Sequence, residues 1–295
     1  MVPILAVLIS ATAGAAVDPA LLDLAMPDAK VVFGVQVSQT LASPFGQYAL
    51  THLLGAEAVT RFAAATGFDP KRDLQEVLVA SSTPGSPGDG SDALILARGV
   101  FAPDKFVTLA GLTGATVSGY RGIQVIQHGP RAFAFLDSAT VAIGTEPLLK
   151  AVIDRRANQT AFAGPLRQKV QDASSTGDAW FATTTPLADL IPANSSGGFN
   201  PATLFQSVME SWAGLHFDSS GVTLVAEALT HSDAEAQGLA GLLKLASGMV
   251  RGTPAAALQY AQVTASGPVT RVTLTVAEQD LERTFRSANP RLAAR

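Results

Sequence analysis

The histidine and carboxylate whose spacing best suits a reaction are His216 and Asp218. They lie two residues apart, so within a strand both side chains would share one face. A carboxylate beside an imidazole can orient the ring as a general base. The same spacing is also typical of an exposed polar face at the end of a hairpin. A hydrolase would further need a hydroxyl group from a distant segment, so this pair alone does not define a site.

No other pattern in the sequence predicts catalysis or cofactor binding. The four histidines lack metal-ligand spacing, and there is no G-x-S-x-G, P-loop or dinucleotide-binding motif. The segment 88–92, GDGSD, lacks the ligand spacing of a calcium-binding loop. Cysteine is absent, which excludes disulfides, thiolate ligands, cysteine nucleophiles and a lipid-modified N-terminal cysteine. We therefore predict a protein without catalytic residues, metal or cofactor.

The charge distribution excludes nucleic acid as a partner. Lys and Arg number 20 and Asp and Glu 24, which gives a formal net charge of −4. The basic residues are scattered and form no face that would neutralise phosphates. Because 47% of the residues are apolar, the chain can bury a substantial core.

The first sixteen residues resemble a secretory signal peptide. Residues 3–16 are apolar or small and are too short to span a bilayer. Ala13 with Ala15, or Gly14 with Ala16, occupies the small positions of a cleavage site. No Lys or Arg precedes the run, and a folded strand or helix is the alternative. We expect export to the periplasm or beyond, with no transmembrane segment later in the chain, and the sequence does not decide whether the leader is cleaved.

Apolar periodicity predicts an α+β protein rich in hairpins. Alternation at 30–37 indicates a strand, and hairpins are expected at 132–143, 215–229 and 257–276. Helical spacing is expected at several other segments, namely 45–66, 145–155, 201–212, 233–247 and 278–287.

The order of these elements repeats, which predicts two similar halves. The first α+β half covers 17–157, a linker with some helix covers 158–176, and the second half covers 177–295. Residues 93–111 match the outline of 222–241, although the identity between them is low. We expect each half to form a mainly antiparallel sheet with helices packed on one face. Coincidence between ordinary α+β patterns is the alternative to duplication.

Two segments carry a resemblance to known proteins. The run TGFDPKRDLQEVLVA (66–80), the later ARGVF (97–101) and the repeated layout resemble uncharacterised exported bacterial proteins with a duplicated α+β fold. The resemblance implies an envelope location. It implies no activity and assigns no functional residue.

Three functions remain open from the sequence. The first is a non-enzymatic exported protein that binds a partner or contributes structure in the bacterial envelope. The second is a carrier of an apolar small molecule, which a large dry cavity would favour. The third is a hydrolase with an unfamiliar site, built around His216 and Asp218.

Overall fold

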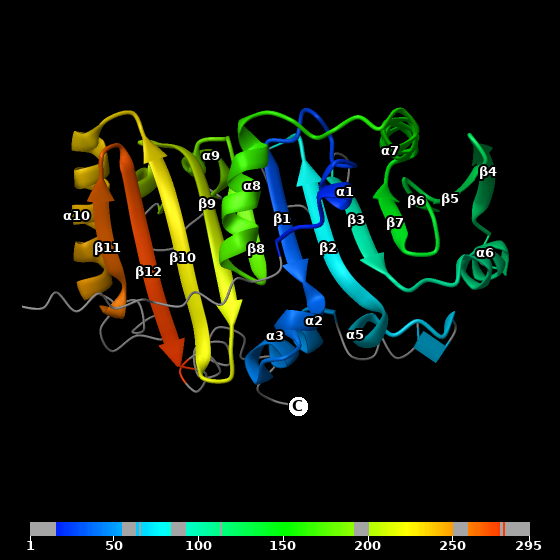
Figure 1. Ribbon diagram of the computed structural model, residues 1–295, viewed down its shortest axis with the longest axis horizontal. Helices are drawn as coiled ribbons and strands as arrows, with labels where there is room; N and C mark the ends of the chain where they lie inside the picture. Colours follow the sequence, from blue (N-terminus) through cyan, green and yellow to red (C-terminus); the bar gives the residue numbers. More distant parts are fainter. Residues whose placement is uncertain are drawn as a thin grey trace, which may run out of the picture.

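The computed structural model describes residues 16–54, 63–64, 66–83, 93–112, 114–191, 201–249, 259–277 and 280. Twelve antiparallel strands form one sheet in the order β11-β12-β10-β9-β8-β1-β2-β3-β7-β6-β5-β4. Figure 1 shows these strands side by side along the longest axis of the molecule. The predicted α+β class and antiparallel pairing are confirmed.

The strands are short at the β4 edge and longest in β9 and β10. Their bounds are β1 Val31–Gln36, β2 Leu74–Ser81, β3 Ala93–Gly99, β4 Thr116–Tyr120, β5 Ile123–His128, β6 Arg131–Phe135, β7 Thr140–Gly144, β8 Ala179–Thr183, β9 Val208–Phe217, β10 Gly221–Thr230, β11 Gln262–Ser266 and β12 Val269–Ala277.

The helices precede the first strand or lie in the connections between strands that follow one another in the chain. Their bounds are α1 Pro19–Leu22, α2 Val37–Thr40, α3 Pro44–Leu54, α5 Pro70–Asp73, α6 Pro103–Leu112, α7 Glu146–Asn158, α8 Pro165–Thr176, α9 Leu187–Leu190 and α10 Asp233–Met249, with a 3₁₀ helix at Pro201–Phe205. None of the helices within the described ranges has the length and apolarity needed to cross a membrane.

The two predicted halves share one sheet, where the sequence predicted a sheet in each. Strand β1 pairs with β2 on one side and with β8, from the second half, on the other. In both halves an early strand pairs with the second strand of a later hairpin: β3 with β7, and β10 with β12. This strand order agrees with the predicted repeat, and duplication itself stays a prediction.

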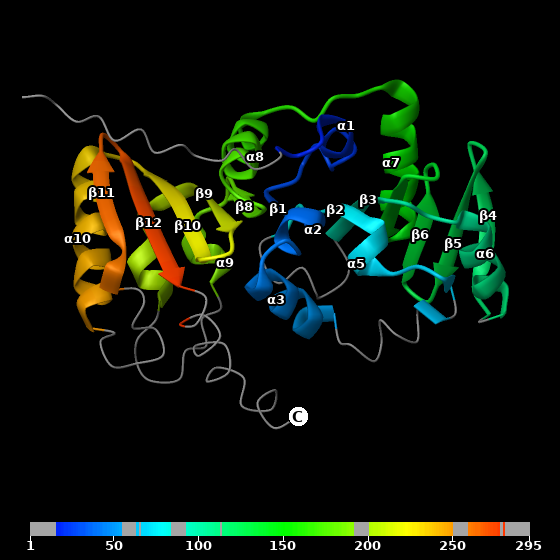
Figure 2. The ribbon, with the colours of Figure 1, turned by 60° about the horizontal axis from the view of Figure 1, so that its bottom comes forward.

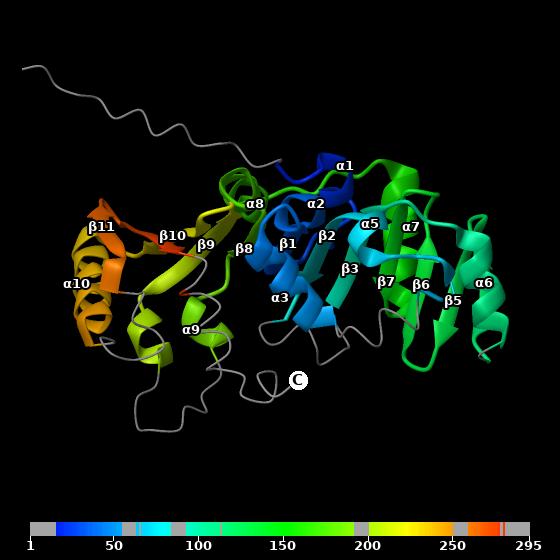
Figure 3. The ribbon, with the colours of Figure 1, turned by 90° about the horizontal axis from the view of Figure 1, so that it is seen from below.

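Helices lie against both faces of the sheet, although one covered face was expected. Helices α1, α7 and α8 cover the face that carries Leu78 and Trp180, which we call the α8 face (Figures 2 and 3). Phe33 and Val77 point to the opposite face, which we call the cavity face, and Phe106 of α6 packs on that side. Both faces are covered because β1, β2, β3 and β7 are apolar on both sides.

Two segments differ from the sequence prediction. The expected helix at 201–212 is a 3₁₀ helix followed by β9, because residues 208–217 pair with both β8 and β10. Pairing with two strands outweighs the helical spacing of the apolar residues. The expected linker contains α8, which buries Leu166, Val170 and Ala173 against the sheet. Residues 1–15, most of 278–287 and much of 55–65 lie outside the described residues.

The junction between the halves depends on a glycine opposite a tryptophan. Gly34 in β1 is the register partner of Trp180 in β8, and the buried indole lies across the glycine. A Cβ atom on Gly34 would overlap the indole ring. An aromatic ring that covers a strand glycine in this way pins the register of the pair.

We expect Gly34→Ala to destabilise the protein by about 1–3 kcal/mol, because the overlap forces the indole or the strand to move. Gly119→Ala in β4 is the matched control, since a Cβ atom there would meet no heavy atom within 4 Å. Urea unfolding followed by tryptophan fluorescence measures both variants. Equal midpoints for the two would contradict the proposed role of this contact.

Candidate functional site

The structure pairs His216 with Asp178, which the sequence analysis did not single out. His216 Nδ1 lies 2.9 Å from Asp178 Oδ2, and the same oxygen accepts a hydrogen bond of 2.9 Å from the amide of Phe217. Asp218 instead closes the turn between β9 and β10. Its carboxylate accepts hydrogen bonds from Ser220 and Gly221, and the Ser220 hydroxyl is the largest cause of its lowered pKa.

The contact between His216 and Asp178 belongs to a row of polar residues on the α8 face. Glu76 in β2 opposes Gln36 in β1, and the register of β1, β8 and β9 continues the row to Asp178 and His216. Gln36, Glu76 and Asp178 are buried. Buried polar groups must find partners among themselves, so this row fixes the alignment of four neighbouring strands.

Glu76 is the most perturbed carboxyl group of this row. Its side chain accepts hydrogen bonds of 3.3 Å from the amide of Asp18, while Arg98, opposite it in β3, forms an ion pair with Asp18. Burial raises the pKa of Glu76 from its ordinary 4.5 to about 7, although a hydrogen bond from Gln36 acts in the opposite direction. The folded state therefore favours the protonated carboxyl group.

We expect the free energy of unfolding to fall as the pH rises from about 4.5 to about 7, because the unfolded chain ionises Glu76 more readily. The shift corresponds to at most about 3 kcal/mol. Glu76→Gln should remove this loss and stabilise the protein above pH 7. Glu146→Gln, at an exposed ion pair with Lys150, is the control. Urea titrations across this pH range test the expectation, and an unchanged pH profile for Glu76→Gln would refute it.

The candidate functional site is an apolar cavity on the cavity face, at the end of the sheet formed by the first half. Its volume is about 390 Å³. Three strands provide its floor: Leu74 and Val77 from β2, on either side of a register shift, Ile95 and Ala97 from β3, and Val141 and Ile143 from β7. Strand register produces this floor, since Val77 opposes Ala97 and Ala97 opposes Val141.

Five phenylalanines form the walls. Phe68 stacks on Phe101 with their ring centroids 5.4 Å apart and meets Phe106 edge-on at 5.9 Å. Phe135 contacts Phe101 at 5.6 Å and Phe106 at 5.0 Å, and Phe133 contacts Phe135 at 5.9 Å. These rings come from two loops, α6 and β6, so the cavity forms only when these elements pack beside β2, β3 and β7. All eleven residues that line it are apolar.

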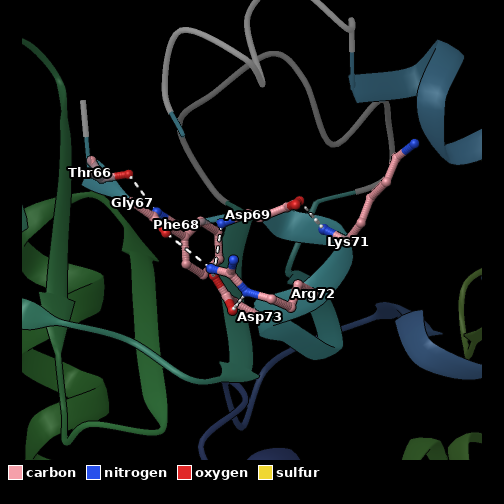
Figure 4. Close-up of polar contacts among 7 residues, drawn as sticks. All are labelled: Thr66, Gly67, Phe68, Asp69, Lys71, Arg72 and Asp73. Carbon is pink, nitrogen blue, oxygen red and sulfur yellow. Dashed lines mark hydrogen bonds and ion pairs between the residues drawn. The ribbon is translucent and has the colours of Figure 1, made fainter. Parts of the chain in front are cut away.

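A hydrogen-bonded loop holds Phe68 over the cavity (Figure 4). Gly67 has a left-handed φ of 74°, and the buried Thr66 accepts a hydrogen bond from the Phe68 amide. Asp69 caps α5 by accepting the amide of Lys71 at 3.0 Å. The loop geometry is thus set by polar contacts, while the phenyl ring turns inward.

Arg72 and Asp73 close this loop. The guanidinium donates two hydrogen bonds of 2.7 Å to the Asp73 carboxylate and one of 3.1 Å to the carbonyl of Gly67. Asp73 also accepts the amide of Asp69 at 2.8 Å. The Arg72 hydrogen bond is the main cause of the lowered pKa of Asp73. Bidentate pairing makes Arg72 and Asp73 a rigid support for Phe68.

The cavity suits binding better than reaction. Among the described residues, its lining offers no side-chain acid, base, nucleophile or metal ligand. Across the described parts of the chain, no group of three or more histidines and carboxylates could hold a metal ion. The sequence patterns did not predict these cavity residues, but five of them lie in the segments 66–80 and 97–101 that carried the resemblance: Phe68, Leu74, Val77, Ala97 and Phe101.

Comparison with known proteins informs the fold only. No protein-family model and no curated protein matches the sequence. Crystal form III of TP0453 has a TM-score of 0.56 at 9% identity, over 92% of this chain and 99% of that one. Form I gives 0.54 at 9% identity, over 93% and 98%. Form IV gives 0.57 at 9% identity, over 92% and 97%. The chain is therefore similar to TP0453 in fold.

Proposed function

We propose that this protein is a non-enzymatic binding protein that carries an apolar small molecule in the cavity of the first half. The observation that carries the proposal is the cavity of about 390 Å³ with an entirely apolar lining. Ligand pockets usually have volumes of roughly 300–1,000 Å³ and are lined mainly by apolar and aromatic side chains.

The size of the cavity distinguishes it from a packing defect. Protein interiors are close-packed and contain few voids larger than a water molecule. Here the floor residues Ile95 and Ile143 and the wall residue Phe133 are only half-buried, although they face inward. A ligand would cover this surface, and each buried methylene group contributes about 0.8 kcal/mol, or roughly fourfold in affinity. The cavity therefore favours a molecule with an alkyl chain.

We expect Ala97→Phe to fill part of the cavity and to weaken binding of a neutral apolar dye at least tenfold, without lowering stability. Ala97 is the smallest floor residue and is 6% exposed. Ala234→Phe, at an exposed position of α10, is the control and should bind like the parent protein. Fluorescence titration with a neutral dye measures both variants. Equal affinity of the two, with both folded, would argue against this cavity as the binding site.

We also propose export to the bacterial envelope, which rests on the signal-like residues 3–16 and on the resemblance carried by 66–80. When the full chain is made in bacterial cells, the periplasmic or secreted protein should begin at Ala16 or Val17 by intact-mass measurement. Leu8→Arg breaks the apolar run and should leave the uncleaved chain inside the cell. A full-length mass for the parent protein, retained in the cytoplasm, would exclude this proposal.

A further inference from the structure

A second, polar hollow adjoins the apolar cavity. It has a volume of about 170 Å³, and three of its lining residues, Phe68, Phe101 and Phe106, also line the cavity. These three phenylalanines therefore separate the apolar cavity from the polar hollow. The remaining lining residues include Arg72 and Lys105.

The charges around this hollow leave one cation uncompensated. Arg72 is neutralised by its bidentate contact with Asp73. Lys105 is exposed on α6, and within the described parts of the chain its ammonium group makes no ion pair or hydrogen bond. Its Nζ atom lies 3.3 Å from the position that a Cβ atom on Gly67 would take, so the ammonium group sits at the Phe68 loop. The hollow therefore carries a local charge of about +1.

The hollow on the other side of Phe135 differs in charge. It is lined by Asp137, which forms an ion pair of 2.7 Å with Arg156, and its other lining residues are neutral. Of these two hollows beside the cavity, only the one at Lys105 offers a cation to an incoming anion.

We propose that the hollow at Lys105 binds the anionic head of an amphiphile whose single alkyl chain occupies the apolar cavity. This inference rests on the proposed function and names its ligand class, an anionic single-chain amphiphile such as a long-chain carboxylate. Burying the chain supplies most of the binding energy, and Lys105 sets the preference for a negative head. Gly67 leaves the ammonium group free to approach that head.

The test compares dodecanoate, dodecanol and dodecyltrimethylammonium as competitors of a neutral dye on the full chain, at pH 8 and low salt. Dodecanoate should bind about fivefold more tightly than dodecanol, as expected for a partly exposed ion pair of about 1 kcal/mol. Salt should reduce this preference, and the trimethylammonium compound should bind most weakly.

Lys105→Ala should abolish the preference for dodecanoate over dodecanol while leaving the affinity for dodecanol unchanged. Lys105→Arg should retain it, and Lys244→Ala, at an exposed lysine of α10, should behave like the parent protein. Equal binding of dodecanoate and dodecanol to the parent, or an equal loss of both in Lys105→Ala, would overturn the head-group site and leave the cavity as a binding site. Failure of all three compounds to displace the dye would instead count against the proposed function.

Discussion

The register between β1 and β8 is the constraint on which the rest of the structure depends. These two strands come from opposite halves of the sequence, and Val31–Val35 of one pair with Ala179–Thr183 of the other. A shift of one residue would exchange the two faces of every strand beyond the junction. The glycine opposite the indole favours the observed alignment, because a Cβ atom at that position would overlap the ring. The position of each side chain in the sheet follows from this central pair.

The register along the sheet separates two kinds of surface. On the α8 face it lines up Glu76, Gln36, Asp178 and His216 as a polar row near one end of the strands. On the cavity face it lines up aliphatic side chains, which become the floor of the cavity. The polar row makes the strand alignment specific, because its buried side chains need hydrogen-bond partners. The apolar floor provides the surface that a ligand in the cavity would contact.

Local patterns of the sequence predict much of the fold but not the site. Alternation at 30–37, the hairpin at 132–143 and the helical spacing at 233–247 correspond to observed strands and to α10. The segment 201–212 misleads, because its apolar spacing fits a helix while pairing with two neighbouring strands makes residues 208–212 the start of β9. The pairing of His216 with Asp178 and the ring of phenylalanines join residues far apart in the sequence. No periodicity within one segment encodes such contacts, since they arise only from strand order.

The central position of β1 also shapes how the molecule is made. The first strand of the described chain lies in the middle of the sheet, and its second partner, β8, follows only after the whole first half has been synthesised. Until then the backbone N–H and C=O groups on one edge of β1 lack the partners that β8 provides. Part of each apolar face of β1 is also uncovered. Pairings over such sequence distances are slow to form, because a long loop must close before any contact is gained. The centre of the sheet therefore cannot close before β8 has been made, and a chain in which β1 still lacks this partner exposes surface that favours aggregation.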